Sequence, residues 1–451
     1  MSATSNTVNN GSRMSALVGW IDARFPMTRM WKEHVSEYYA PKNFNFWYYF
    51  GSLALVVLVL QIVTGIFLTM NYKPSAAEAF ASVEYIMRDV EWGWLIRYMH
   101  STGASAFFIV VYLHMFRGIM YGSYKTPREL VWIFGMLIYL ALMAEAFFGY
   151  LLPWGNMSYW GAQVIVSLFG AIPGIGESLV EWIRGDYYIS DITLNRFFAL
   201  HVVALPIALI FLVIAHILAL HEVGSNNPDG VEIKKLKGPD GHPVDGIPFH
   251  PYYTVKDGFA IVAFFILFAW FVFFAPDALG HADNYTPANP LQTPAHIVPE
   301  WYFLPFYAML RAVPEKLMGV LTMFGAIALL FAVPWLDTSK VRSMRYRPTA
   351  RWFFLFFVLA VVLLGWCGGQ LPDDVVIPVG HNEAGHPVGF TVVWLSRILA
   401  VYYYAYFLIV LPLLGLMEKP LPVPDSISTP VLSGGGAAVP AGAAASPEKK
   451  G

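Results

Sequence analysis

The chain has 451 residues, of which 57% are hydrophobic and 13% are charged, about half the charged fraction of an ordinary soluble domain. This composition excludes a soluble globular enzyme and a disordered chain, and the single cysteine, Cys367, excludes a disulfide scaffold, thiolate-ligated iron–sulfur clusters and covalently attached c-type haem. A formal charge of −2, with no basic stripe, argues against a nucleic-acid partner.

Apolar segments of membrane-spanning length dominate the chain after residue 45. A transmembrane helix needs about 20 mostly apolar residues to cross about 30 Å of hydrocarbon, and eight stretches meet this requirement. They are Phe46–Met70, Leu95–Phe116, Leu130–Leu151, Phe197–Leu220, Gly258–Pro276, Leu317–Leu336, Trp352–Leu371 and Ile398–Met417. The sequence therefore predicts an all-α integral membrane protein with eight transmembrane helices.

Basic residues predict the orientation of these spans. Most of the 28 Lys and Arg residues lie on the side that holds the N-terminus, and the positive-inside rule makes that side cytoplasmic. An even number of spans then places both termini in the cytoplasm. We expect no removable signal peptide, because the polar N-terminal segment has no apolar core followed by a small-residue cleavage site.

The loops on the opposite, outer side are unusually long. Residues 152–191 and 277–315 are rich in aromatic residues, Pro and Gly, and the run 165–174 is too apolar for a free loop. We therefore expect amphipathic helices on the outer surface. The segment 419–451 is rich in Ala, Gly and Pro and is predicted to be a disordered cytoplasmic tail.

Two spans carry two histidines each, His100 with His114 and His201 with His216. Separations of 14 and 15 residues correspond to about 21 and 22.5 Å along a helix and return to broadly the same face. Both helices run from outside to inside, so depth pairs His100 with His201 and His114 with His216. Two axial imidazoles leave no open position on a haem iron, which suits electron transfer. The alternative is hydrogen bonding between helices, which explains a lone histidine better than two matched pairs.

Glycines and arginines near these histidines fit the same interpretation. Two glycine pairs in the first and third spans repeat the 14-residue interval: Gly51, Gly65, Gly135 and Gly149. Helix faces without Cβ atoms allow a flat porphyrin edge to approach, although ordinary packing through small residues gives the same pattern. Arg97 and Arg117 each lie three residues from a histidine. They could pair with haem propionates or anchor the helix at the interface.

Four further motifs occur in order along the chain. They are Gly149-Tyr150 with Leu152-Pro153-Trp154-Gly155, Met157-Ser158 and Trp160-Gly161; His221-Glu222 with Gly224-Ser225-Asn226-Asn227-Pro228; Phe249-His250-Pro251-Tyr252-Tyr253; and Pro299-Glu300-Trp301-Tyr302 with Leu304-Pro305-Phe306-Tyr307. With these residues the chain resembles, from about Trp47 to Met417, the cytochrome b subunit of the bacterial quinol–cytochrome c oxidoreductase, the cytochrome bc complex.

The resemblance implies two non-covalent b-type haems, an outer one of low potential and an inner one of high potential, and two quinone sites. In the outer site Glu300 would accept a proton from quinol, with Tyr307 nearby and Phe147, Gly161 and Pro299 shaping the pocket. A carboxylate in an apolar niche has a raised pKa that suits this task, although position alone equally suits a helix-capping acid. The inner site would contain His221, Ser225, Lys256 and Asp257.

The resemblance also implies a division of the chain and a set of partners. The expected segments are 1–45, a cytoplasmic N-terminal segment; 46–222, a four-helix dihaem bundle; 223–256, a cytoplasmic loop; 257–418, a C-terminal four-helix region; and 419–451, the tail. The expected partners are a Rieske iron–sulfur protein, a c-type cytochrome, a second copy of the complex and membrane lipids. The expected location is the bacterial inner membrane.

The implied activity is quinol oxidation at the outer face, electron transfer across the membrane and quinone reduction at the inner face, with proton translocation. The catalytic subunit would be inactive without its iron–sulfur and c-type cytochrome partners. Two alternatives remain open. A dihaem anchor of a respiratory dehydrogenase also has histidine pairs but usually about five spans, and a proton-coupled transporter could use the histidines as a relay, although no inverted repeat is evident.

Three features of the sequence depart from the family pattern. The separation of 15 between His201 and His216 is one longer than in most respiratory members, and a kink at Pro206 could absorb the extra residue. Asn156 replaces a common Gln. Glu145 lies inside the third span where the family usually has a neutral residue, and it is either a proton-path residue or an acid bonded to a neighbouring helix.

Overall fold

The computed structural model describes residues 10–428 of the chain. In this range eight helices are long and apolar enough to cross a membrane, as predicted. Their segments are η2 and α3 (Phe46–Tyr48, Tyr49–Thr69), α5 (Gly93–Tyr121), α6 (Glu129–Leu151), α9, η4 and α10 (Asp191–Ala199, Leu200–Ala204, Leu205–Val223), α11 (Tyr252–Phe274), α13 (Lys316–Leu336), α14 (Pro348–Gly369), and α15, η9 and α16 (Val392–Ala405, Tyr406–Val410, Leu411–Met417).

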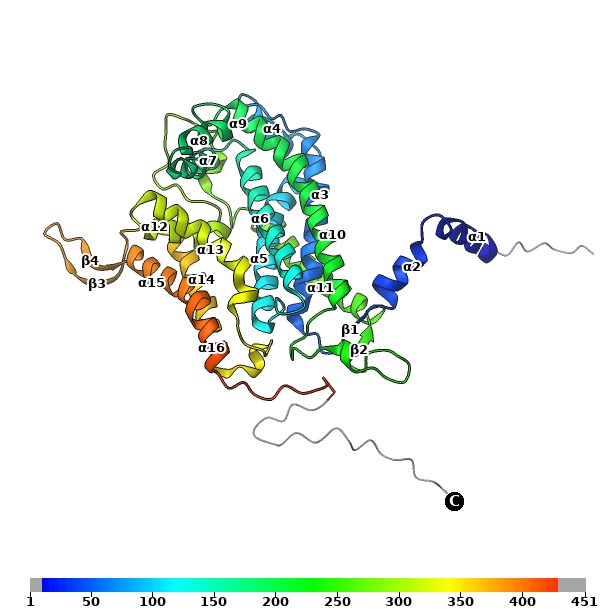
Figure 1. The fold of residues 1–451 in the computed structure, drawn as a ribbon. Coiled ribbons are helices and arrows are strands. Elements are labelled where there is room, and N and C mark those ends of the chain that lie inside the picture. Colours follow the sequence, from blue (N-terminus) through cyan, green and yellow to red (C-terminus); the bar gives the residue numbers. More distant parts are fainter. Residues whose placement is uncertain (1–9, 429–451) are drawn as a thin grey trace, which may run out of the picture.

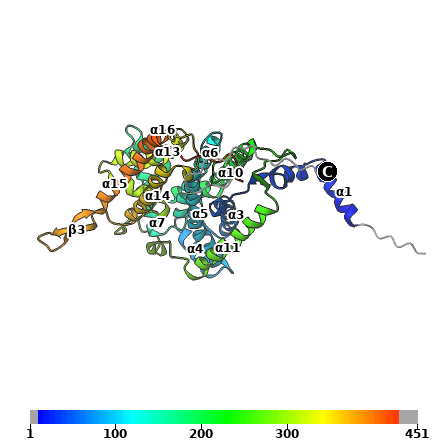
Figure 2. The ribbon, with the colours of Figure 1, turned by 90° about the horizontal axis from the view of Figure 1, so that it is seen from below.

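Helix α5 lies at the centre of the molecule. It packs against α3 and α11 on one side and against α14 on the other, whereas α6 packs along α10 (Figures 1 and 2). The helices α3, α5, α6 and α10 form one half of the bundle, and α12 (Leu304–Ala312), α13, α14 and α15 form the other. Aromatic side chains between the halves, such as Phe108, Tyr302 and Phe357, are almost fully buried. Because the lipid solvates apolar side chains, close packing rather than water exclusion holds these helices together.

Short helices cover the outer end, as the long loops predict. They are α4 (Ala79–Arg88), α7 (Asn156–Leu168), η3 (Phe169–Ala171), α8 (Gly176–Arg184), η6 (Ala282–Tyr285) and η7 (Trp301–Phe303). The apolar run is explained by burial, since Leu168 is buried and Val166 packs in a cluster with Leu194. The two outer loops are also joined, because Asn156 donates its backbone N–H to Thr286 at 3.0 Å.

The inner end carries short elements that the sequence pattern did not predict. Helices α1 (Asn10–Asp22), α2 (Met27–Trp31) and η1 (Lys32–Ser36) precede a strand, β1 (Tyr39–Pro41), which pairs antiparallel with β2 (Gly246–Pro248). Further short helices are η5 (Ile233–Lys235) and η8 (Met344–Tyr346). Away from the inner end, a β-hairpin of β3 (Val375–His381) and β4 (Pro387–Thr391) lies between α14 and α15 and projects from the bundle (Figure 1).

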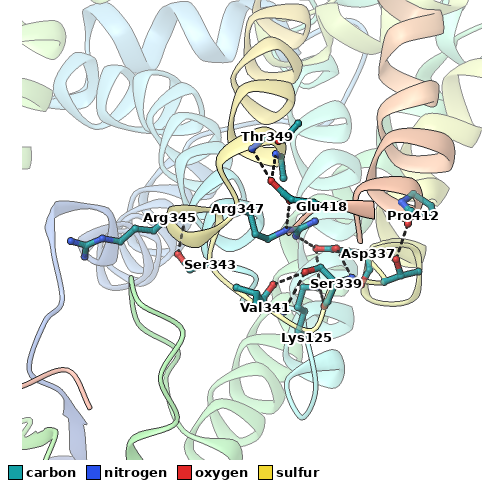
Figure 3. A network of polar contacts seen from close by, with 12 residues as sticks. Lys125, Asp337, Ser339, Val341, Ser343, Arg345, Arg347, Thr349, Pro412 and Glu418 are labelled. Carbon is teal, nitrogen blue, oxygen red and sulfur yellow. Dashed lines mark hydrogen bonds and ion pairs between the residues drawn. The ribbon is translucent and has the colours of Figure 1, made fainter. Parts of the chain in front are cut away.

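A buried ionic network fastens the two halves together at the inner end (Figure 3). Asp337, which follows α13, accepts from Lys125 at 3.0 Å and from Arg347 at 2.9 Å. Burial alone would raise the pKa of Asp337, but the charges of Lys125 and Arg347 hold it below its usual value. Glu418 accepts from the backbone N–H of Thr349 at 2.7 Å and fixes the end of α16 to the first turn of α14.

The predicted C-terminal tail is described only in part. Residues 419–428 run back along the inner end, where Ser426 donates to Asp245 at 2.8 Å. Ile427 also donates its backbone N–H to Asp245, at 3.1 Å. The rest of the predicted tail, 429–451, lies outside the described residues.

Candidate functional site

The four intramembrane histidines lie in the two pairs that helix depth predicts. The ring centroids of His100 and His201 are 6.2 Å apart, with 88° between the ring planes. Those of His114 and His216 are 6.3 Å apart, at 62°. Two metal–nitrogen bonds of about 2 Å, plus about 1 Å for each half-ring, give a centroid separation of about 6 Å. Both pairs therefore have the separation that a shared axial metal requires.

Each glycine of the two predicted pairs faces one of these imidazole rings. A Cβ atom at Gly51 would lie 3.3 Å from Cε1 of His114, and one at Gly65 would lie 3.3 Å from Cε1 of His100. Gly135 stands in the same relation to His216, and Gly149 faces His201 more closely still. The glycines thus make room first for the axial ring, where the sequence interpretation considered only the porphyrin edge.

The extra residue between His201 and His216 is absorbed by a π-helical turn, and not by a proline kink as the sequence suggested. Residues Leu200–Ala204 form the π-helix η4, in which the N–H of Leu205 bonds to the carbonyl of Leu200. A π-turn accommodates one residue more than an α-turn over the same rise, and such bulges are frequent at functional sites. Pro206 follows in the first turn of α10, where its missing N–H costs little.

The second ring nitrogens of the histidines have different partners. Nδ1 of His100 lies 2.9 Å from the hydroxyl of Thr64, and that hydroxyl donates to the carbonyl of Leu60. Nδ1 of His201 donates to the backbone carbonyl of Glu145 at 2.9 Å, and Oε1 of Glu145 lies 3.1 Å from the same nitrogen. The departure at Glu145 is therefore a contact with a histidine of the neighbouring helix.

The inner histidines have different neighbours. Nδ1 of His114 lies 3.1 Å from a guanidinium nitrogen of Arg117. His216 faces the backbone carbonyl of Val131, although its Nδ1 makes no hydrogen bond of ideal geometry. Arg117 also covers the ring of Tyr48 at 4.7 Å, and its buried Nε has no hydrogen-bond partner in the described chain. Its place beside His114, inside the bundle, favours a role at the histidine pair over simple anchoring at the interface.

Two cavities lie at the outer half of the bundle. The first, of about 650 Å³, is lined by the outer histidines, by the two glycines that face them and by three charged groups. These residues are His100 and His201, Gly65 and Gly149, and Glu145, Arg97 and Glu300. The second, of about 740 Å³, is almost entirely apolar and is lined by Phe147, Gly161, Pro299 and Tyr307 among others. The structure therefore separates the predicted outer-site residues, because Glu300 lines the first cavity and the other four line the second.

Glu300 is a titratable group of the first cavity, and its neighbour in the chain, Pro299, lines the second. Burial raises its pKa to about 7, against the opposing effects of a hydrogen bond from Tyr150 and the positive charge of Arg97. The carboxyl group is fixed by the motif that follows it, since Trp301 donates to Ser105 at 3.0 Å and Tyr302 stacks on Phe108 at 3.9 Å. A carboxyl group with a pKa near neutrality can gain and lose a proton at physiological pH.

Tyr307 lies on α12 and faces the apolar cavity. Its hydroxyl donates to the carbonyl of Ile297 at 3.2 Å, and the guanidinium of Arg311 covers its ring at 4.4 Å. Burial raises the pKa of Tyr307, so its hydroxyl remains a hydrogen-bond donor at neutral pH.

The predicted inner-site residues occupy two neighbouring positions at the inner end. Ser225 lies 3.0 Å from the hydroxyl of Tyr38, whose ring stacks on His221 at 4.4 Å. Lys256 and Asp257 lie on the first turns of α11, where the ammonium group of Lys256 covers the ring of Tyr252 at 5.1 Å. The described residues give no direct contact between the two positions.

Sequence reasoning missed two residues of this inner site. Nδ1 of His34 lies 3.0 Å from Nδ1 of His221, and the two rings stack at 5.2 Å. Tyr38 lies four residues beyond His34, so the N-terminal segment brings both side chains to His221. The only sequence signal was a histidine and a tyrosine four residues apart, directly before the first span.

Comparisons with known proteins agree with this geometry. The family model Cytochrome b/b6/petB matches residues 35–224, and Cytochrome b(C-terminal)/b6/petD matches residues 287–384. The chain is 57% identical to a cytochrome b of Allochromatium vinosum, over 91% of this chain and 98% of the relative, and 52% identical to one of Rickettsia bellii, over 94% and 99%. It is 50% identical to a cytochrome b/c1 of Bradyrhizobium diazoefficiens, of which it covers 58%.

A solved structure shows the same fold. The chain of a hyperthermophilic respiratory Complex III superposes with a TM-score of 0.79 at 40% identity, over 89% of this chain and 99% of the other. Matched models over both halves and relatives above 50% identity over nearly the full length leave no other family to consider. The chain belongs to the cytochrome b family.

Proposed function

We propose that this chain is the dihaem cytochrome b subunit of a proton-translocating quinol–cytochrome c reductase. The observation that carries the proposal is the pair of histidine couples, 6.2 and 6.3 Å between centroids, on the two helices α5 and α9–α10. Among residues 10–428 no cluster of three or more His, Cys, Asp or Glu side chains suits a metal held by protein alone. Two opposed imidazoles instead suit a group that supplies its own equatorial ligands.

The residues around each couple fit a b-type haem. His100 and His201 would hold the outer group, His114 and His216 the inner one, and Arg97 and Arg117 would pair with propionates. The glycines facing each ring and the buried, unpartnered Nε of Arg117 support this fit. When bound, the two haems supply reversible one-electron transfer between the two faces of the membrane.

At the outer face, the chain's own residues would bind quinol and take up its proton. The apolar cavity at Phe147, Gly161, Pro299 and Tyr307 suits a quinone ring and its tail. Glu300 directly precedes η7, which leads into α12, the helix that carries Tyr307. The pKa of Glu300, about 7, suits a proton acceptor. Because Glu300 also lines the cavity of the outer histidine couple with Arg97, we propose that it moves the proton away from the quinol site toward the outer surface.

At the inner face, His221, Ser225, Lys256 and Asp257 would bind quinone and deliver protons from the cytoplasm. The stack of His34, His221 and Tyr38 supports a site that is closed on one side by the N-terminal segment. Both termini would then be cytoplasmic, in a bacterial inner membrane. The relatives named cytochrome b/c1 and Complex III support partners of the Rieske and c-type cytochrome kinds, and we propose that the complex is a dimer.

Purification of the intact complex tests this function. We expect two b-type haems per chain by pyridine haemochrome assay and antimycin- and stigmatellin-sensitive reduction of cytochrome c by quinol. A transporter would contain no haem. A dehydrogenase anchor would contain haem but would reduce no cytochrome c with quinol and would be insensitive to these inhibitors.

A further inference from the structure

The two histidine couples differ in what surrounds their outward-facing nitrogens. At the outer couple both Nδ1 atoms face oxygen acceptors, from Thr64 for His100 and from Glu145 for His201. At the inner couple His114 faces the cation of Arg117. His216 faces only the backbone carbonyl of Val131 and no side-chain acceptor in the described chain. Groups that contact the ring nitrogen not bound to the metal set the orientation and basicity of a metal-bound imidazole.

Glu145 is the acidic member of this set. Its side chain is only 17% exposed, Oε1 lies 3.1 Å from Nδ1 of His201, and Oε2 is buried without a hydrogen-bond partner among residues 10–428. The residue lies four positions before Gly149, so it and Gly149 contact the same imidazole from successive turns of α6. One N–H shared between the backbone carbonyl and a carboxyl oxygen is a common bifurcated arrangement.

The corresponding position at the inner couple has no carboxyl group. Val131 lies four residues before Gly135, which faces His216 in the way that Gly149 faces His201. The same helix therefore presents a carboxyl oxygen to one axial histidine and an apolar side chain at the equivalent position of the other. This difference makes Glu145 specific to the outer couple.

We propose that Glu145 is a positioning residue that holds the ring of His201 and lowers the reduction potential of the outer haem. This inference rests on the proposed role of His201 as an axial ligand. An oxygen beside Nδ1–H makes the imidazole more basic, and a more basic ligand stabilises the ferric state over the ferrous state. An acceptor oxygen is sufficient for this effect, and a carboxyl group offers one whether or not it is ionised.

The arrangement also gives a physical basis for unequal haems in one bundle. The outer couple, with the added carboxyl group of Glu145, favours the oxidised state, and the inner couple, beside the cation of Arg117, favours the reduced state. Moving an electron inward costs free energy when the field across the membrane is negative inside. A step from lower to higher potential offsets this cost.

The test is a redox titration of the purified complex carrying Glu145→Leu, Glu145→Gln or Val131→Leu. Outer-shell changes typically alter metal affinity about 10-fold or more, and a tenfold change in a one-electron equilibrium is about 59 mV. We expect Glu145→Leu to raise the outer potential by about that amount and leave the inner one unchanged. Glu145→Gln keeps an acceptor oxygen and should stay near the unmodified protein, and Val131→Leu should move neither potential.

A spectroscopic measurement checks the positioning role separately. The ferric EPR signal of a bis-imidazole haem reports the angle between its two rings, here 88° at the outer couple. We expect the outer signal to shift in Glu145→Leu and to stay unchanged in Val131→Leu. If Glu145→Leu assembles without the outer haem, Glu145→Gln decides: retained haem at an unshifted potential supports the role.

Three results would overturn the inference. They are an unchanged outer potential and EPR signal in Glu145→Leu, equal shifts of both potentials, or a shift in Glu145→Gln as large as in Glu145→Leu. Absence of the outer haem from the unmodified complex contradicts the proposed function instead, so the two failures are distinguishable.

Discussion

Gly149 and His201 make the tightest contact between a glycine and an axial-type histidine in the described bundle. A Cβ atom at Gly149 would lie 2.9 Å from Nδ1 and 3.0 Å from Nε2 of His201, closer than real Cβ contacts allow. The equivalent distances to Nδ1 are longer at the other three glycines: 3.7 Å from Gly135 to His216, 3.5 Å from Gly51 to His114 and 3.9 Å from Gly65 to His100. The ring of His201 can therefore occupy its place only because residue 149 has no Cβ atom. Of the four glycines, Gly149 is the one at which an added side chain should disturb its histidine most.

Gly149→Ala is therefore expected to remove the outer haem and spare the inner one. The added methyl group would displace the ring of His201 from its position opposite His100. The backbone of α6 cannot move aside without disturbing its packing against α10. The haem content per chain should fall from two toward one. Gly258→Ala on α11 is the matched control, because nothing lies within 4 Å of its Cβ position. Equal haem loss in both variants, or none in Gly149→Ala, contradicts the assignment.

Glu300→Gln is expected to slow quinol oxidation about 100-fold, the lower end of what a positioned general base contributes. Burial raises the pKa of Glu300 to about 7, and a proton acceptor must be deprotonated. The rate in the unmodified complex should therefore rise as pH increases through about 7, and this rise should be absent in Glu300→Gln. Steady-state cytochrome c reduction between pH 5.5 and 9 measures both effects.

Tyr150→Phe gives an independent check on the same carboxyl group. The hydrogen bond from Tyr150 opposes the effect of burial and lowers the pKa of Glu300. Its loss should move the rise in rate to higher pH while the plateau at high pH stays close to normal. A shift to lower pH, or an unchanged profile, would show that Glu300 does not control this step.

His34→Ala is expected to weaken quinone reduction at the inner face about three- to tenfold, which corresponds to the loss of one hydrogen bond. The contact with His221 at 3.0 Å and the stacking of the two rings motivate this prediction. His242→Ala serves as control, since His242 also stacks on a tyrosine, Tyr39, at 4.5 Å, outside the proposed site. Comparable loss in the two variants would reduce His34 to a structural residue.

Asp337→Ala is expected to destabilise the protein by about 3–5 kcal/mol, because it leaves the buried charge of Lys125 without its carboxylate and Arg347 with only the longer contact to Glu418, at 3.4 Å. Arg345→Ala breaks an ion pair with Asp229 whose arginine is 52% exposed, and should cost less than about 1 kcal/mol. Thermal unfolding of the detergent-solubilised protein, followed by haem release, compares the two. Similar midpoints would mean that the network in Figure 3 does not join the halves of the bundle.

The sequence predicted the features that depend on periodicity and composition. The eight spans follow from the apolar length needed to cross the bilayer, and the pairing of His100 with His201 follows from helix rise and direction. The glycine interval, interpreted as room for a porphyrin edge, marked Gly149 as a position of close approach, and the structure places the ring of His201 there.

Features that depend on contacts between distant residues could not be predicted in this way. The π-turn at Leu200–Ala204 leaves no mark in composition, and a proline two residues beyond it suggested the wrong device. His34 reaches His221 across 187 positions, and Glu145 reaches His201 across 56. Both pairs are set by how helices and the N-terminal segment pack, and no local pattern in one sequence encodes that packing.

The most direct test of the account is a haem count with an optical redox titration of the intact complex, compared with His201→Leu and His216→Leu. We predict two b-type haems per chain in the unmodified protein, with the inner one at the higher potential. His201→Leu should lose the low-potential haem alone, and His216→Leu should lose the high-potential haem alone. A single haem in the unmodified chain, or loss of the same haem in both variants, would contradict the assignment of two histidine couples to two haems.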